Sequence, residues 1–299
     1  MIKNWIQAFR FRTLPLSISG ILVGSFLAFR NGKFDGVLFV LALITVLFLQ
    51  ILSNLANDLG DHIKGTDNKE RIGPKRSTQT GAISKEQMKK GIFFFACLSI
   101  FSGVTLAYLG TRDMSFATQI TFYLLALTCM LAAIGYTLGK NAYGYLGLGD
   151  LFVFLFFGIL SVCGIYTLMT KSFEFVILLP ALSIGFLSVA VLNLNNMRDH
   201  KNDAKCGKRT LVVKIGFVHA LKYHFALLLF PIITTVWFAA TTNSWWLLLS
   251  LLTYIVLARH ILFVIQNPFP EKLDSQLGKV ALSTFLYAII FSACCIFLL

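Results

Sequence analysis

The segment that decides the fold is 36–61, GVLFVLALITVLFLQILSNLANDLGD, an apolar run that ends in Asn54, Asp58 and Asp61. A helix crosses the hydrocarbon core of a bilayer with roughly 20 mostly apolar residues. The apolar part of the segment has that length, so we expect it to span a membrane. Its polar end then lies at one membrane surface, where ionisable side chains are usually functional.

The composition extends this expectation to all 299 residues, of which 57% are hydrophobic and only 13% charged. Such a chain is too apolar for a water-soluble domain. Runs such as 151–166 are apolar on every face, whereas a membrane β-barrel shows alternating segments of roughly 10 residues. We therefore expect an all-α, polytopic membrane protein, a single domain over 1–299 with nine transmembrane helices in a bundle. The expected spans are 14–30, 36–56, 91–110, 116–138, 151–169, 174–194, 223–240, 245–266 and 279–299.

The net charge of +13 raises the question of nucleic-acid binding. The sequence has no basic soluble domain, so we expect membrane lipid and no nucleic acid as its surroundings. With the N-terminus in the cytoplasm, about 21 Lys and Arg fall on the cytoplasmic side and about four on the other, and the positive-inside rule favours that orientation. The long polar loops 57–90 and 195–222 then face the cytoplasm. Residues 1–13 resemble an interfacial helix.

The second polar segment repeats the pattern of the first. Residues 192–199 read LNLNNMRD, which places Asn195 and Asp199 four apart at the end of an apolar run, as Asn54 and Asp58 are. Four expected helices separate the two segments, which indicates a parallel internal repeat. The repeat predicts two equivalent polar clusters at the cytoplasmic mouth of one bundle.

The acidic residues of the two segments are spaced for a shared metal site. Positions four and seven or eight apart lie on one helix face, so Asp58 and Asp61 follow Asn54, and Asp199 and Asp203 follow Asn195. Converging carboxylates repel one another unless a cation joins them. Oxygen ligands without His or Cys at ligand spacing favour Mg²⁺, which typically bridges carboxylates to substrate phosphates.

The same two segments are rich in bases that can bind phosphate oxygens. Acids that hold a metal, next to bases that bind phosphate, predict a diphosphate site. The basic residues of the two segments are Lys64, Lys69, Arg71, Lys75 and Arg76 in the first, and Arg198, Lys201, Lys205, Lys208 and Arg209 in the second.

A third cytoplasmic segment, GYTLGKNAYGYLGLGD at 135–150, lies on the same expected membrane face. It carries Tyr136, Tyr143 and Tyr145, together with a lysine, Lys140, and the acid Asp150. Each tyrosine alone is typical of a membrane interface. Aromatic faces also stabilise a cation, and ionisation of an allylic diphosphate generates one.

The sequence resembles a known family over nearly its whole length. The matching strings are QILSNLANDLGDHIKGTDNKERIGPKR (50–76), GYLGLGDLFVFLFFG (144–158) and NNMRDHKNDAKCGKRTLVVKIG (195–216). They look like the 1,4-dihydroxy-2-naphthoate polyprenyltransferases of menaquinone synthesis, within the UbiA superfamily of intramembrane aromatic prenyltransferases. The resemblance implies nine helices around a central cavity in a bacterial inner membrane, and Mg²⁺-dependent transfer of a prenyl chain from a polyprenyl diphosphate with loss of the naphthoate carboxylate.

The resemblance also assigns roles by position. It makes Asp58, Asp61, Asp199 and Asp203 the metal ligands, with Asn54 and Asn195 completing the two diphosphate motifs. Tyr136 and Lys140 match a Tyr-x-x-x-Lys element whose lysine contacts diphosphate. The remaining residues expected to bind substrate are Lys64, Asp67, Arg71, Arg76, Tyr143, Arg198 and Arg209. The chain departs from the family at Phe11 and Asn141, where Pro and Arg are usual.

Two alternatives remain open from the residues. The same architecture is found in secondary transporters, although their sites usually lie near the bilayer midplane. Within the enzymes, the aromatic acceptor could instead be 4-hydroxybenzoate, homogentisate or a haem precursor, because only the resemblance selects the naphthoate. The run 152–157, rich in Phe, is expected to line an apolar channel for the isoprenoid tail.

Overall fold

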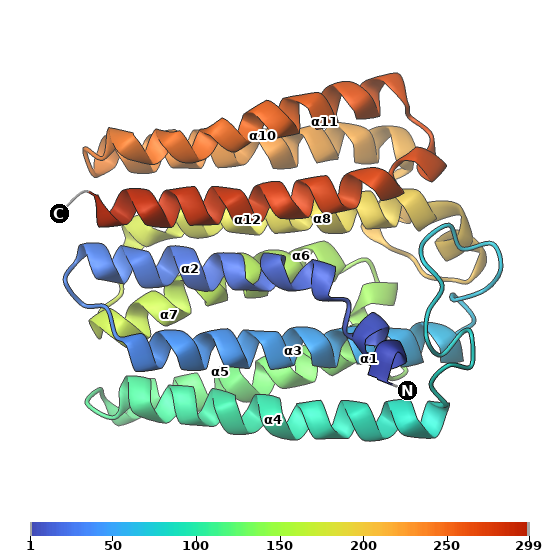
Figure 1. Ribbon diagram of the computed structural model, residues 1–299, viewed down its shortest axis with the longest axis horizontal. Helices are drawn as coiled ribbons and strands as arrows, with labels where there is room; N and C mark the ends of the chain where they lie inside the picture. Colours follow the sequence, from blue (N-terminus) through green and yellow to red (C-terminus); the bar gives the residue numbers. More distant parts are fainter. Residues whose placement is uncertain (1, 298–299) are drawn as a thin grey trace.

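Long helices lie side by side through most of the molecule, and the short helix α1 and the loop after α3 gather at one end (Figure 1). The computed structural model describes residues 2–297, and every regular element in that range is helical. The elements are α1 (Ile2–Phe9), η1 (Phe11–Thr13), α2 (Leu14–Arg30), α3 (Gly36–Ile63), α4 (Lys85–Thr111), α5 (Phe116–Gly135), η2 (Tyr143–Tyr145), α6 (Gly149–Val153), η3 (Phe154–Leu160), α7 (Ser161–Thr170), η4 (Phe175–Ile177), α8 (Leu178–Lys205), α9 (Leu211–Ile215), α10 (Phe217–Thr241), η5 (Trp245–Thr253), α11 (Tyr254–Gln266), η6 (Pro270–Lys272) and α12 (Asp274–Ile296).

The expected all-α membrane fold is confirmed. Eight helices of the described chain are long and apolar enough to cross a bilayer. The pair α1 and α2, bent by 53° where they meet, supplies a ninth span when the two are counted together. None of the 20 residues of α5 is buried in the protein, so this apolar helix lies at the edge of the bundle with its outer face toward lipid.

The helices α3 and α8 extend beyond the spans expected from hydropathy. The apolar runs end near 56 and 194, whereas the helices continue to Ile63 and Lys205. The added turns are polar yet largely buried, because charged groups from other parts of the chain cover them. The acidic residues therefore lie on rigid helix and not in loops, which fixes the direction of each side chain.

Two expected helices are interrupted. The span 151–169 contains the π-helical segment η3 between α6 and α7. Here Gly158 packs directly on α8, because a Cβ added to it would lie 2.5 Å from the Cα of Gly185. The span 245–266 begins with nine residues of 3₁₀ helix, η5, before α11. Hydropathy detects an apolar run but does not distinguish these helix types.

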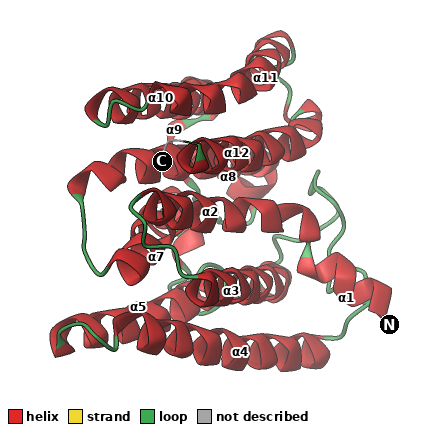
Figure 2. Ribbon diagram, turned by 60° about the vertical axis from the view of Figure 1, so that its left-hand side comes forward, coloured by secondary structure: helices red, strands yellow, loops and turns green. Residues whose placement is uncertain are grey.

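The core lies between the two outer sets of helices. Figure 2 shows α2, α8 and α12 enclosed between α10 and α11 on one side and α3, α4 and α5 on the other. Side chains of α2, α7, α8 and α12 form one large buried apolar cluster. A smaller cluster joins the C-terminal half of α3 and the N-terminal half of α4 to α1. The second cluster holds α1 against the end of the bundle that carries the polar residues.

The close contact at Gly158 predicts a site that tolerates no side chain. We expect Gly158→Ala to lower the free energy of unfolding by about 1–3 kcal/mol, because the added carbon overlaps the backbone of α8. The matched control is Gly278→Ala, a helical glycine with nothing within 4 Å of an added Cβ, which should be neutral or stabilising. Thermal unfolding in detergent measures both, and equal stability of the two variants would contradict the packing.

Candidate active site

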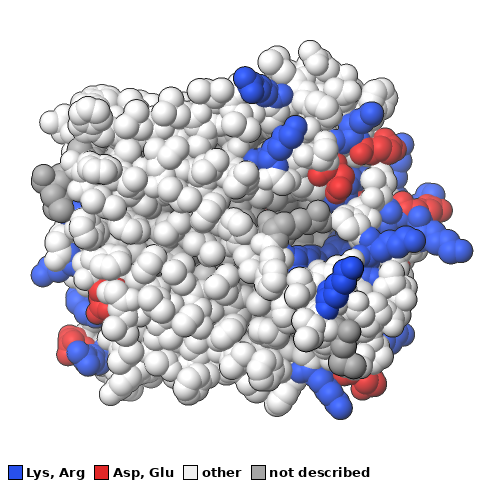
Figure 3. Space-filling view, viewed as in Figure 1, with Lys and Arg blue, Asp and Glu red and all other residues white. Residues whose placement is uncertain are grey.

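Charged side chains concentrate at the end of the bundle where α3 and α8 terminate. Figure 3 shows Lys, Arg, Asp and Glu crowded at that end, with a hollow among them, while the middle of this face is almost uncharged. A cavity of about 750 Å³ opens there. Its charged and amide lining residues are Gln7, Arg10, Gln50, Asn57, Asp58, Asp61, Arg71, Lys75, Arg76, Asn195, Arg198, Asp199, Asp203 and Lys208. The two predicted polar clusters therefore meet in one cavity.

Asp58 is buried on α3 and is neutralised by two arginines. The guanidinium of Arg10 contacts its carboxylate from the segment after α1. Arg76 Nη1 lies 3.2 Å from the same oxygen, Oδ1. The sequence did not predict Arg10 as a site residue, because its contact with Asp58 spans 48 residues of chain and depends on how α1 folds back.

Asp61, one turn further along α3, binds groups from two other segments. The hydroxyl of Tyr145 donates to Asp61 Oδ1 at 2.8 Å, and Lys208 Nζ lies 3.3 Å from the same oxygen. Burial alone would lower the pKa of Lys208, but the carboxylates of Asp61 and Asp203 raise it above its ordinary value, so the ammonium stays charged. The sequence indicates only an aromatic role for Tyr145, but its hydroxyl orients Asp61, a predicted metal ligand.

On α8, both carboxylate oxygens of Asp199 accept hydrogen bonds from one arginine. Arg198 Nε and Nη2 donate to its two oxygens at 3.0 and 2.6 Å, the paired geometry that favours arginine for carboxylates. Arg71 approaches the same carboxylate, with Nη2 3.7 Å from Oδ2. Arg198 Nη2 also donates to Asn195 Oδ1 at 2.9 Å. Asp203, one turn on, is buried and lines the same cavity.

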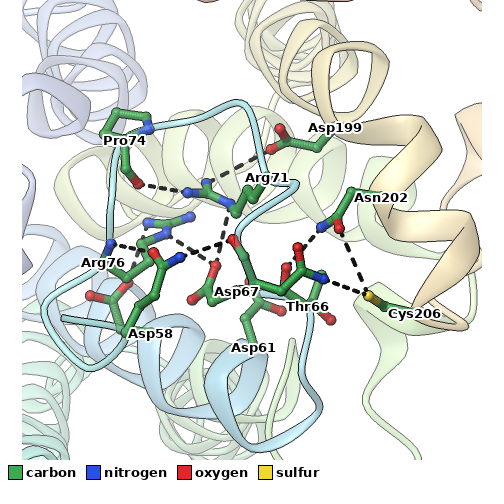
Figure 4. Close-up of polar contacts among 12 residues, drawn as sticks. Asp58, Asp61, Thr66, Asp67, Arg71, Pro74, Arg76, Asp199, Asn202 and Cys206 are labelled. Atoms are coloured by element: carbon green, nitrogen blue, oxygen red, sulfur yellow. Dashed lines mark hydrogen bonds and ion pairs between the residues drawn. The ribbon is translucent and has the colours of Figure 1, made fainter. Parts of the chain in front are cut away.

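The loop 64–84 covers the site and is fastened to both helices. Asn202 Nδ2 of α8 donates to Thr66 O at 2.8 Å, and Thr78 Oγ1 donates to Asp58 O of α3 at 2.9 Å. Figure 4 shows the loop carrying Asp67, Arg71 and Arg76 across the cavity between the two helices. The loop therefore brings its two arginines to acids on different helices.

Asp67 is a buried acid that no hydrogen-bond donor reaches. Neither carboxylate oxygen has a hydrogen-bond partner, although Arg71 Nε and Arg76 Nε lie 3.3 and 3.7 Å from Oδ1. Burial, reinforced by the negative charge of Asp61, raises the pKa of Asp67 to about 7. Asp67 does not line the cavity, whereas Arg71 and Arg76 do. Asp67 therefore holds these two arginines from the side away from the cavity.

Besides Asp67, four predicted site residues lie away from the cavity lining. Asn54 points to the N-terminal segment, where its Nδ2 donates to Phe9 O at 2.9 Å, so it fastens α1. Lys140 and Arg209 are exposed. Lys64 Nζ lies 4.0 Å from the ring centroid of Tyr145. Helical spacing correctly placed Asn54 near Asp58, but it is Asn57 that faces the cavity.

Aromatic rings form the wall next to the acidic groups. Tyr136 and Tyr143 line the cavity, as predicted for the third segment. The Tyr143 ring stacks on Phe152 at 4.0 Å between centroids and meets Tyr136 edge-on at 5.3 Å. Phe156 and Phe157 also line the cavity. Beyond them the walls become apolar along α4, α5 and α7.

The acidic groups fit a hard divalent cation that is shared with a substrate. All cavity-lining acids offer carboxylate oxygens, the ligands Mg²⁺ prefers. Within residues 2–297, no three His, Cys, Asp or Glu side chains converge on one point. A cation held by one or two of these acids therefore needs further oxygens, which phosphate groups can supply.

Known proteins resemble the chain in sequence and in fold. The chain is 42% identical to the 1,4-dihydroxy-2-naphthoate octaprenyltransferase of Haemophilus influenzae, over 97% of this chain and 95% of that protein. It is 39% identical to the Escherichia coli enzyme of the same name, over 97% and 94%. A UbiA homolog from Archaeoglobus fulgidus bound to DMAPP and Mg²⁺ shares the fold, with a TM-score of 0.61, 15% identity and coverage of 97% and 99%.

The family model described as the UbiA prenyltransferase family matches residues 17–297, which is nearly the whole chain. The match to the two octaprenyltransferases named above covers almost their full length. The reading as a secondary transporter is therefore wrong. From this match and the helical bundle around the charged cavity, we conclude that the chain belongs to the UbiA prenyltransferase family and is a multi-span membrane prenyltransferase.

Proposed function

We propose that the protein transfers a polyprenyl group from its diphosphate to 1,4-dihydroxy-2-naphthoate, with Mg²⁺ and with loss of the carboxylate, to give a demethylmenaquinone in its reduced, dihydroxy form. The observation that carries the proposal is one cavity with a charged end, an aromatic wall and a long apolar end. These three parts match the diphosphate, the reacting carbons and the isoprenoid tail. Relatives 42% and 39% identical carry the name of this activity, which supports the naphthoate over other aromatic acceptors.

The charged end holds the diphosphate. Asp58 and Asp61 on α3 and Asp199 and Asp203 on α8 would hold Mg²⁺, which supplies positive charge to the leaving diphosphate. The bases Arg71, Lys75, Arg76, Arg198 and Lys208 line the same end. As the allylic C–O bond breaks, their guanidinium and ammonium groups stabilise the charge that develops on the phosphate oxygens.

The apolar end receives the tail. Along α3 the lining extends from Asp61 back to Ala42. These two residues are 19 positions apart, which corresponds to about 28 Å along the helix axis. That length approaches the thickness of the hydrocarbon core. Small side chains such as Thr45, Gly103, Ala107 and Ala126 line this part and leave room between the helices. An isoprenoid chain there is removed from water, which favours binding in proportion to its apolar area.

The aromatic wall lies where the allylic cation forms. When the C–O bond breaks, the diphosphate leaves with the electron pair and the first isoprenoid carbons carry positive charge. The faces of Tyr136, Tyr143 and Phe152 stabilise that charge. The electron-rich ring of the naphthoate attacks at the carbon that bears the carboxylate. Carbon dioxide then leaves from this carbon, and its bonding electrons restore the aromatic ring.

The distribution of charge supports an orientation with the N-terminus and the active-site loops in the cytoplasm. Lys and Arg crowd the end of the bundle that carries the cavity mouth (Figure 3), and positive charge favours the cytoplasmic side. We place the protein in a bacterial inner membrane, where its two lipid-soluble partners, donor and product, also reside.

Asp58→Ala and Asp199→Ala should each lower the rate of prenyl transfer about 100-fold or more, because each removes a carboxylate from the diphosphate end. The rate is measured in membranes supplied with Mg²⁺, a prenyl diphosphate and the naphthoate, by the mass of the product. Asp113→Asn is the matched control, since this exposed acid pairs with Arg112 at the opposite end of the bundle. Full activity in either alanine variant would contradict the assignment.

Removal of divalent cations should stop the reaction reversibly. We expect EDTA to abolish product formation in wild-type membranes and Mg²⁺ added in excess to restore it, because the site consists of oxygen ligands without His or Cys. Turnover that resists the chelator would show that the acids act without a metal.

Ala107→Phe should shorten the prenyl chains that the enzyme accepts. Ala107 lines the apolar end of the cavity and is 3% exposed, so a phenyl ring there fills space needed by the far end of a long tail. We expect activity with an octaprenyl donor to fall at least tenfold relative to activity with a geranyl donor. Exclusion of only two methylene groups of the tail from the cavity would already cost about 1.6 kcal/mol of binding free energy. Product masses from competing donors measure the ratio.

Val104→Phe is the control for this experiment. Val104 lies three residues earlier on α4, and it is 40% exposed on the outer surface of the bundle. The same ring placed there should leave the preference for chain length unchanged. An unchanged preference in Ala107→Phe would show that the tail lies elsewhere.

A further inference from the structure

Arg198 is a buried arginine that contacts acids on two helices. Its side chain is 2% exposed. On one side it holds both oxygens of Asp199 through Nε and Nη2. On the other side Nη1 donates to Asp274 Oδ1 at 2.5 Å. Asp274 is the first residue of α12, 76 residues away in the chain.

This arrangement raises a question for the proposed function. Both oxygens of Asp199 accept a hydrogen bond from Arg198, so the guanidinium competes with Mg²⁺ for this carboxylate. Arginine stays charged in proteins, and a buried charge without a partner is strongly unfavourable. Arg198 therefore needs an acceptor that remains in place when Asp199 is released.

Asp274 meets that requirement. Its side chain is 40% exposed, so it retains some contact with water, and it does not line the cavity. It contacts Nη1, the arm of the guanidinium that Asp199 does not use. With Nη1 held, Nε and Nη2 are free to turn from Asp199 to phosphate oxygens, which accept the same paired geometry.

The surroundings of Arg198 limit where else it can move. A Cβ added to Gly73 would lie 2.5 Å from Arg198 Nη2. The backbone of the loop 64–84 therefore packs against one side of the guanidinium. Arg71 lies on the same side, against Asp199. The guanidinium is therefore confined between the loop and α12, and within the described chain Asp274 is its ion-pair partner on α12.

We propose that Asp274 is a positioning residue, which anchors Arg198 from α12 so that Asp199 can bind Mg²⁺ while Arg198 transfers to the diphosphate. The inference rests on the proposed diphosphate site and gives α12 a part in it. Without Asp274, Arg198 remains fully engaged with Asp199 and competes with the metal.

A merely structural role for Asp274 predicts a different result. An acid at the first turn of a helix stabilises the helix dipole, and its loss would lower stability without changing how the site responds to Mg²⁺. The N-cap of α12 is Leu273, whereas the Asp274 side chain accepts a hydrogen bond from Arg198. The response to Mg²⁺ therefore separates the two roles.

The experiment compares Asp274→Asn and Asp274→Glu with wild-type protein in detergent. Thermal unfolding is measured without metal, and again with Mg²⁺ and farnesyl diphosphate in the absence of any aromatic acceptor. Initial rates with acceptor are measured over a range of Mg²⁺ concentrations. Glu271→Gln is the matched control, because Glu271 is a nearby exposed acid on η6 and its neutralisation changes the local charge equally.

For Asp274→Asn we expect the Mg²⁺ concentration at half-maximal rate to rise about tenfold, with a smaller change in kcat, as for loss of a group that orients a metal ligand. The stabilisation by Mg²⁺ and farnesyl diphosphate should shrink, while the metal-free protein unfolds near the wild-type temperature. Asp274→Glu and Glu271→Gln should resemble wild type. In an Arg198→Gln background, Asp274→Asn should have no further effect on the Mg²⁺ response.

An unchanged Mg²⁺ response in Asp274→Asn would overturn the inference, as would an equal loss in the Arg198→Gln background. The unfolding measurement is independent of the acceptor. If the naphthoate is not prenylated but the stabilisation by Mg²⁺ and farnesyl diphosphate still depends on Asp274, the proposed acceptor is wrong and the role of Asp274 stands.

Discussion

Buried carboxylates at the ends of α3 and α8 are neutralised by cations that come from distant parts of the chain. Arg10 and Arg76 neutralise Asp58, Lys208 contacts Asp61, and Arg198 holds Asp199. Removing one partner from a buried ion pair costs about 3–5 kcal/mol, because it leaves an uncompensated charge. The positions of α1, the loop 64–84 and the start of α12 all depend on these pairs.

The same pairs reconcile stability with function. Carboxylates this close together repel one another, and the neighbouring arginines and lysines remove that repulsion. In the proposed function, the acids would exchange these cationic side chains for a metal, and the released side chains would bind phosphate oxygens.

The rest of the cavity follows from how the helices pack. Glycine and alanine let helices approach closely at Gly158 and Gly185, whereas small side chains around Gly103 and Ala107 border open space. The helix α6 brings Phe152 to the cavity, and the π-helical segment η3 that follows it brings Phe156 and Phe157. Such segments are frequent at functional sites. Here the segment joins the aromatic wall to the apolar end.

The sequence by itself determined the membrane fold, because apolar runs of bilayer length admit few alternatives to helices. It also determined the pairs of acids, because spacings of three and four residues on a helix fix a shared face. The tertiary structure alone decided what covers those faces. Asn54 fastens α1 and does not line the cavity, Lys140 and Arg209 lie outside it, Arg10 pairs with Asp58, and Asp274 pairs with Arg198. A local pattern fixes the direction of a side chain along its own helix, but the partner that meets it comes from 48 or 76 residues away and is set by packing.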